Sequence, residues 1–356
     1  MTSRLAFSPA LATTLAIALA GGGVFWLLGL PAGWLAGAML AVTAASLAGV
    51  ATRVPDWLRQ AIFVLLGVQI GSAVSWDTIV HIGNWPVSMV VMAATVGAVT
   101  AASYVYYRRA AGWPPVAALL GGIPGAFSMV MALAEAHKSD VPSIAVVQCI
   151  RLFFLIAVLP LVMTAAGLHG LDTAADAQDM SPASLALVIA AGAVAGMAAH
   201  RLGVPAGLIL GAAAASSGLE LAGLAEGAMP DWVLVPAFVV LGAMIGTRFT
   251  QFSLGRLKGL AGVGLASFLL AFAVSAAGAF ASSALTGIEP ALTLIAFAPG
   301  GLETMTIMAF ALGLDPAFVA AHQVGRYFLL SFAMPMAAMW AARRPNRHGP
   351  PPMAPQ

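Results

Sequence analysis

Apolar segments long enough to cross a lipid bilayer recur along nearly the whole chain, and this feature limits the fold more than any other. A membrane-spanning helix needs about 20 consecutive, mostly apolar residues. Only 8% of the 356 residues are charged, whereas a soluble domain carries about 25%. Such a chain cannot cover itself with a solvated surface, so the sequence predicts an all-α polytopic membrane protein.

The second constraint is an internal repeat. Pro31-Ala32-Gly33 recurs as Pro205-Ala206-Gly207 at an offset of 174 residues, and after one inserted residue the offset stays at 175. The matches at the second offset are Pro55-Asp56-Trp57 with Pro230-Asp231-Trp232, Gly67 and Gly71 with Gly242 and Gly246, Pro124-Gly125 with Pro299-Gly300, and Gln148 and Arg151 with Gln323 and Arg326. We expect two homologous membrane repeats, at 8–167 and 184–341. An acidic linker at 168–183 joins them, and a disordered tail at 342–356 follows.

The distribution of basic residues predicts the topology. Ten spans are expected, near 8–28, 32–50, 57–74, 86–107, 141–167, 184–200, 205–224, 232–247, 259–282 and 318–341. The segments 114–137 and 291–312 are interpreted as re-entrant hairpins. With ten spans, every loop Lys and Arg falls on one face, which the positive-inside rule makes cytoplasmic. Five spans per half is an odd number, so the two halves should be inverted, with both termini in the cytoplasm.

Each expected hairpin contains a dense cluster of helix-breaking residues. The clusters are Gly121-Gly122-Ile123-Pro124-Gly125 and Ala298-Pro299-Gly300-Gly301. A helix that starts inside the membrane leaves its first N–H groups unpaired, and two such N-termini converging near the midplane could bind an anion. The alternative is a packing kink in each hairpin.

A buried charge is expected in each half, in Gln148-x-x-Arg151 and Gln323-x-x-Arg326. Residues three apart share a helix face, and each Arg lies about 15 Å from its helix end. A charge at that depth costs about 2.5–3.5 kcal/mol and needs partners. These could be a carboxylate, carbonyl groups or a bound anion. The alternative is that each Arg clamps the broken backbone of its own hairpin.

Glu303 breaks the symmetry, since its counterpart is Ser128. An intramembrane carboxylate can switch between neutral and charged forms, so Glu303 is a candidate proton or cation carrier. The alternative is a static salt bridge to Arg326 or Arg151. Hydroxyls near the breaks could add ligands, although such groups often bond back to their own helix. The expected substrate-binding residues are Pro124, Gly125, Ser128, Gln148, Arg151, Pro299, Gly300, Gly301, Thr304, Gln323 and Arg326, with Glu303 coupling transport to an ion.

Glycine pairs spaced four apart predict close helix packing. The pairs are Gly33/Gly37, Gly67/Gly71, Gly207/Gly211 and Gly242/Gly246. The spans that carry them are expected to form a rigid panel, while the hairpins belong to a separate core.

The duplicated Pro-Ala-Gly starts, the Gly-x-x-Ile-Gly ends, the Ala-Pro-Gly-Gly-Leu-Glu segment and the closing His322-Gln323-x-x-Arg326 run resemble the AbrB family of bacterial integral membrane proteins, over residues 10 to 340. These proteins contain the membrane AbrB duplication and share a name with an unrelated soluble transcription factor. The resemblance implies a bacterial inner-membrane location. Members are labelled ammonia monooxygenase, regulator of gene expression or transporter.

The sequence does not support two of these labels, the ammonia monooxygenase and a regulator that binds nucleic acid directly. The six histidines are dispersed, whereas a copper site needs clustered imidazoles, so neither an enzyme nor a bound cofactor or metal is expected. No soluble basic domain that could bind nucleic acid is present.

Without a Gly-x-x-x-x-Gly-Lys motif for ATP, an ion gradient is the expected energy source. The prediction is a secondary transporter of a small, anionic solute, coupled to protons or Na⁺; a homo-oligomer is compatible with it. The alternative is a membrane sensor that regulates gene expression indirectly, without transport.

Overall fold

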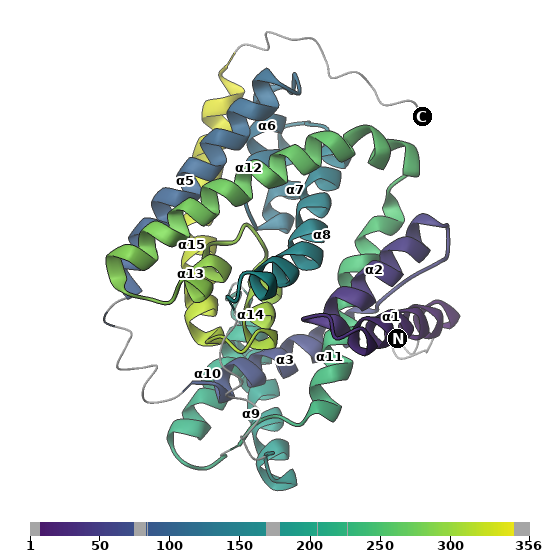
Figure 1. Ribbon diagram of the computed structural model, residues 1–356, viewed down its shortest axis with the longest axis vertical. Helices are drawn as coiled ribbons and strands as arrows, with labels where there is room; N and C mark the ends of the chain where they lie inside the picture. Colours follow the sequence, from purple (N-terminus) through teal and green to yellow (C-terminus); the bar gives the residue numbers. More distant parts are fainter. Residues whose placement is uncertain are drawn as a thin grey trace. The chain divides into compact units, whose positions relative to one another are not determined.

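The computed structural model describes residues 8–74, 83, 85–168, 179–204, 206–225 and 227–344. Arg4, His81, His169, Arg347 and His348 lie outside these ranges. So do most of the predicted acidic linker and the predicted disordered tail from 345 onward. The described residues form fourteen α-helices and one 3-10 helix (Figure 1).

The helices of the two halves begin at equivalent positions, as the sequence repeat requires. The first half contains α1 (Pro9–Leu27), α2 (Gly33–Leu47), α3 (Asp56–Ser72), α5 (Trp85–Arg109), α6 (Pro115–Gly122), α7 (Phe127–Ala136) and α8 (Val141–Ala165). The second half contains α9 (Pro182–Arg201), α10 (Gly207–Leu221), α11 (Asp231–Gly246), η2 (Thr247–Gln251), α12 (Leu254–Thr286), α13 (Pro290–Phe297), α14 (Leu302–Ala311) and α15 (Pro316–Ala342). From α3 and α11 onward the helix starts keep the offset of 175, except at α5 and α12.

Six helical segments of the described chain are long and apolar enough to cross a membrane. They are Pro9–Leu27, Trp85–Arg109, Val141–Ala165, Pro182–Arg201, Asp231–Gln251 and Leu254–Thr286. All six coincide with predicted spans, and the other four predicted spans are also helical. In α1, α5, α9 and α12, no more than a third of the apolar window is buried inside the protein. Such outward apolar faces are those of a multi-pass membrane protein.

The chain divides into two compact units that do not follow the repeat boundary. The panel unit comprises Met1–Gly83, Pro160–Gln251 and Thr306–Phe318. The hairpin unit comprises Asn84–Leu159, Phe252–Met305 and Val319–Gln356. Each unit therefore combines equivalent helices from both halves.

Within the panel unit, Gly33/Gly37 and Gly207/Gly211 join helices of the same half (α2 with α1, α10 with α9), whereas Gly67/Gly71 and Gly242/Gly246 join helices of opposite halves. α3 packs on α10, and a β-carbon at Gly67 would collide with the carbonyl oxygen of Ile209. α11 packs on α2 in the same way, and a β-carbon at Gly242 would collide with the carbonyl oxygen of Leu35. Backbone contacts this close exclude any side chain, so the sequence needs glycine at these positions.

Within the hairpin unit, the chain reverses between α6 and α8. The Gln148 side chain donates a hydrogen bond to the carbonyl of Leu120 (3.0 Å), and Arg151 donates one to that of Ile123 (3.0 Å). α8 therefore advances alongside α6 in the same direction. Because α7 connects them, it must carry the chain back toward the end where α6 began. α13 and α15 also run in the same direction, since Gln323 and Arg326 bond to carbonyls of Ala296 and Ala298.

Candidate functional site

The first helix break follows α6. Ile123 is extended, and the next turn contains two residues in the left-handed region, Gly125 (φ 85°) and Ala126 (φ 52°). Ala126 precedes α7 and offers no side-chain acceptor to its first N–H groups. A left-handed Ala costs about 1–2 kcal/mol, so the surrounding structure must hold it in place.

The second break follows α13. Ala298 is extended, and the N–H of Gly300 donates to the carbonyl of Ala298 (2.8 Å) before α14 begins at Leu302. Pro299 and Gly300 are buried. A β-carbon at Gly300 would lie 2.7 Å from Cδ2 of Leu155 on α8, so this turn is tightly enclosed.

The two breaks meet inside the hairpin unit. A β-carbon added at Gly125 would lie 3.3 Å from the carbonyl oxygen of Gly300 and 3.3 Å from Nη2 of Arg326. Two segments that are 175 residues apart in the sequence thus approach each other at one place. The interpretation of each break as an independent packing kink does not account for this convergence.

Arg151 and Gln148 hold the first break. Arg151 is 4% exposed, and its Nη2 donates to the carbonyl of Ile123 and to Oε1 of Gln148 (2.8 Å). Nε2 of Gln148 donates to the carbonyl of Leu120 and, at 3.4 Å, to that of Ile123. The carbonyls at the end of α6 therefore receive their hydrogen bonds from α8.

Arg326 and Gln323 hold the second break in the equivalent way. Arg326 is 3% exposed and donates from Nη1 to the carbonyl of Ala298 (2.7 Å). Its Nη2 donates to the carbonyl of Gly300 and to Oε1 of Gln323. These contacts are those of the alternative in which each arginine clamps the broken backbone of its own hairpin. The carbonyl groups that accept these hydrogen bonds do not neutralise the positive charge of the arginine.

The two guanidinium groups have no acidic partner within the described chain. Arg59 and Asp56 form an ion pair on the surface of the panel unit, but neither Arg151 nor Arg326 forms one with a described residue. The charge of Arg151 acts unfavourably on Arg326, and Nε of Arg151 is buried without a hydrogen-bond partner among the described residues. Two buried positive charges that repel each other make this site electrostatically suited to an anion.

The other predicted residues surround the breaks at different depths. Glu303 lies half-buried in the first turn of α14, near Gly301, and forms no ion pair with a described residue, so the static salt bridge is absent there. Thr304 is buried, whereas Ser128 is exposed and Pro124 is buried. No cluster of three His, Cys, Asp or Glu side chains occurs among the described residues.

One buried polar pair was not predicted as part of the site. His322 is fully buried on α15, and its Nε2 lies 2.7 Å from Oγ of Ser88 on α5. The repeat gives no signal for this pair, because the equivalent positions are Val147 and Val263.

Comparison with known proteins places the chain in a family. The family model described as "Transition state regulatory protein AbrB" matches residues 34–342. The chain is 27% identical over 316 residues to "Putative regulator AbrB" of Escherichia coli (strain K12), which covers 87% of this chain and 90% of that protein. It is 26% identical over 352 residues to "Uncharacterized protein YhjN" of Bacillus subtilis (strain 168), with 90% of each chain covered. The chain belongs to the AbrB family of helical membrane proteins.

Proposed function

We propose that this protein is a secondary transporter of a small anion, driven by an ion gradient and not by ATP. The observation that supports this most directly is the pair of buried arginines at the two converging helix breaks. A guanidinium group buried without a carboxylate is costly unless a ligand supplies the missing negative charge. An anion between Arg151 and Arg326 would do so, and the N-terminus of α7, where Ala126 provides no side-chain cap, would add the positive end of a helix dipole.

The proposed ligands divide into two kinds. The arginines supply charge, while Gln148 and Gln323 orient them through hydrogen bonds to their guanidinium groups. Glycine at 125, 300 and 301 lets the ligand approach the backbone. Glu303 is the proposed coupling group: protonation or cation binding there would change the charge beside the anion site.

The proposed topology has ten spans in two inverted repeats, with α6–α7 and α13–α14 as re-entrant hairpins. The parallel course of α6 and α8 supports the first hairpin, and that of α13 and α15 supports the second. The division of helices supports a panel unit that stays fixed while the hairpin unit exposes its site to each side in turn. Both termini would then lie on the cytoplasmic side of the inner membrane.

The test combines binding with flux. Purified protein is screened by thermal shift against inorganic anions and small carboxylates, and each stabilising anion is then assayed for uptake into proteoliposomes under an imposed proton or Na⁺ gradient. Arg326→Gln should abolish both the shift and the uptake. Arg326→Lys, which keeps the charge, should retain part of each. Arg256→Gln, at the exposed start of α12, is the matched control.

A membrane sensor is the second candidate, favoured by the word "regulator" in the name of the Escherichia coli relative. A sensor would use the same arginines to bind an anion but would not release it across the membrane. Anion-induced stabilisation that depends on Arg326, with no gradient-driven uptake by folded protein, would select the sensor and reject the transporter.

A further inference from the structure

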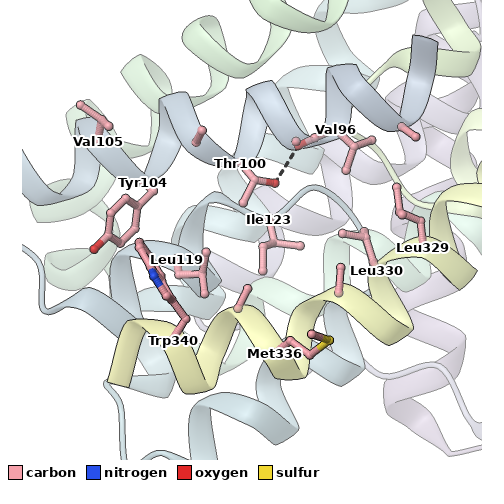
Figure 2. A pocket seen from close by; sticks show the side chains of 15 residues that line it. Val96, Thr100, Tyr104, Val105, Leu119, Ile123, Leu329, Leu330, Met336 and Trp340 are labelled. Atoms are coloured by element: carbon pink, nitrogen blue, oxygen red, sulfur yellow. Dashed lines mark hydrogen bonds between the residues drawn. The ribbon is translucent and has the colours of Figure 1, made fainter. Parts of the chain in front are cut away.

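A groove of about 620 Å³ lies within the hairpin unit, between α5 and α15 (Figure 2). Its walls are almost entirely apolar, and its floor is formed by Leu119 of α6 and by Ile123, which directly follows α6. The floor side chains are buried, with Ile123 only 1% exposed, whereas Val105 and Met336 on the walls are 44% and 68% exposed. The groove is therefore open sideways, and its volume is in the range of about 300–1,000 Å³ that is usual for ligand pockets.

The length of the groove matches one leaflet of a bilayer. Its α5 wall extends from Ala93 to Val105 and its α15 wall from Leu329 to Trp340. At about 1.5 Å per residue, these stretches measure about 18 and 17 Å. Half of a hydrocarbon core of about 30 Å is about 15 Å. An acyl chain lying along the groove would therefore cover one leaflet from the headgroup level to the midplane.

One end of the groove carries the features of a headgroup site. Figure 2 shows Tyr104 and Trp340 together at this end, with ring centroids 5.8 Å apart. Four arginines follow at this end: Arg108 and Arg109 in the last turn of α5, and Arg343 and Arg344 directly after α15. The guanidinium of Arg344 lies 4.5 Å from the centre of the Trp340 ring, and Arg108 donates to the carbonyl of Trp113 at 2.7 Å. None of the four forms an ion pair within the described chain.

We propose that this groove binds one acyl chain of an anionic phospholipid, with the phosphate held at the arginine end. Interfacial aromatic residues and several cations at the mouth fit a negatively charged headgroup, whereas an uncharged hydrophobic ligand would use only the walls. The inner part of the chain would contact Ile123, whose carbonyl oxygen accepts the hydrogen bond from Arg151. Lipid binding would thus stabilise the first helix break. This inference does not depend on the proposed transport.

Native mass spectrometry of the purified protein tests the proposal. The protein is titrated in detergent with phosphatidylglycerol and, separately, with phosphatidylcholine of the same acyl chains. We expect one phosphatidylglycerol to be retained per chain, with a preference over phosphatidylcholine. Arg344→Gln should reduce that preference about fivefold, as expected for the loss of one interfacial charge. Lys258→Gln, which removes one charge at the start of α12, should leave it unchanged.

The groove itself is tested by filling it. Gly97 lines the α5 wall, and a β-carbon there meets nothing within 4 Å, so Gly97→Leu can occupy the groove without displacing the backbone. It should abolish retention of the lipid, whereas Ala98→Leu, on the exposed surface next to the groove, should not. Equal retention of the two lipids by the unmodified protein overturns the proposal, as does equal behaviour of the two leucine variants. Retention of a second protein copy in place of lipid also overturns it.

Discussion

At the residue scale, Gly125 differs from a glycine in an ordinary turn in what surrounds it and not in its positive φ. Gly112 also has a positive φ, but a β-carbon there meets nothing within 4 Å, whereas one at Gly125 approaches Arg326 and Gly300. Gly112→Ala and Gly125→Ala should each cost about 1–2 kcal/mol, because both place an alanine in the left-handed region. Gly125→Ala should cost at least about 1 kcal/mol more, because it crowds the two breaks, and it should weaken anion-induced stabilisation. Thermal unfolding midpoints of both variants measure the difference; equal losses would show that the breaks tolerate a methyl group.

Asp315, before α15, gives a residue-scale prediction for pH. Its Oδ1 accepts hydrogen bonds from the N–H groups of Ala317 (2.8 Å) and Phe318 (3.3 Å). These bonds oppose the effect of burial, which is larger and raises the pKa of Asp315 above its ordinary value. The folded protein therefore holds this proton more tightly than the unfolded chain. The resulting stability is fully present below the unfolded pKa of about 3.9 and is lost as the pH rises through the folded pKa.

Asp315→Asn keeps an N-cap acceptor and removes the ionisable group. Lowering the pH from about 7 to about 5 should therefore raise the unfolding midpoint of the unmodified protein relative to that of Asp315→Asn. Asp315→Ala, which lacks the cap, should be less stable than Asp315→Asn throughout. A midpoint difference between the unmodified protein and Asp315→Asn that is independent of pH, or that changes in the opposite direction, contradicts the assignment.

Sequence reasoning selected buried polar residues mainly because the duplication repeats them, and it missed a buried pair that the duplication does not repeat. Arg151 and Arg326 stand out because a charge appears twice at equivalent depth in apolar helices. Their hydrogen-bond partners are mostly backbone carbonyls, which no residue type reveals. His322 and Ser88 have apolar counterparts, and their pairing depends on how α5 packs against α15, so a single sequence could not indicate it.

At the element scale, the glycine pairs predict close approach but not the partner helix. The pairs on α3 and α11 contact α10 and α2 in the other half of the chain, whereas those on α2 and α10 contact α1 and α9 in their own half. Two glycines four residues apart leave one side of a helix without side chains, and any helix with small residues could approach that side. The helix limits were more predictable, because apolar length and the Gly-Pro breaks depend only on local sequence. The reversal through α7 was expected from the distribution of charges, and the contacts of α6 with α8 support it.

The contact between α11 and α2 can be tested with a matched pair of glycines. Gly242→Ala would direct a methyl group at the backbone of Leu35, and the helices must separate to admit it. We expect a loss of about 2 kcal/mol or more. Gly218→Ala, in α10, meets nothing within 4 Å and should gain up to about 1 kcal/mol from helix propensity. Chemical or thermal unfolding in detergent measures both. Equal effects would mean that the panel unit is not packed through Gly242.

At the scale of the whole molecule, the duplication explains why the two units cut across the chain. Each half contributes three helices to the panel unit, namely α1–α3 and α9–α11. The hairpin unit takes α5, α6, α7 and most of α8 from the first half, and α12, α13 and most of α15 from the second, whereas α14 is divided between the two units at Thr306. The glycine pairs predicted a panel of the four helices that carry them, α2, α3, α10 and α11; the panel unit also contains α1 and α9, which that prediction did not include. The sequence could not show that α3 packs on α10 and α11 on α2, each in the other half, because a hydrophobic helix has the same sequence pattern whichever half it packs against.

The proposed inverted topology can be tested with a pair of residues at equivalent positions of the two repeats. Asp56 and Asp231 each begin a helix, are separated by the offset of 175, and are both exposed. In a Cys149→Ala background, Asp56→Cys and Asp231→Cys are labelled in intact cells with a membrane-impermeant maleimide. Since five spans separate equivalent positions in an inverted pair, Cys at 231 should react from outside, whereas Cys at 56 should react only after lysis. If both residues react from the same side, the number of spans per half is even and the hairpins cross the membrane. The helix breaks would then belong to two parallel repeats, and an anion site reached alternately through inverted halves would lose its structural basis.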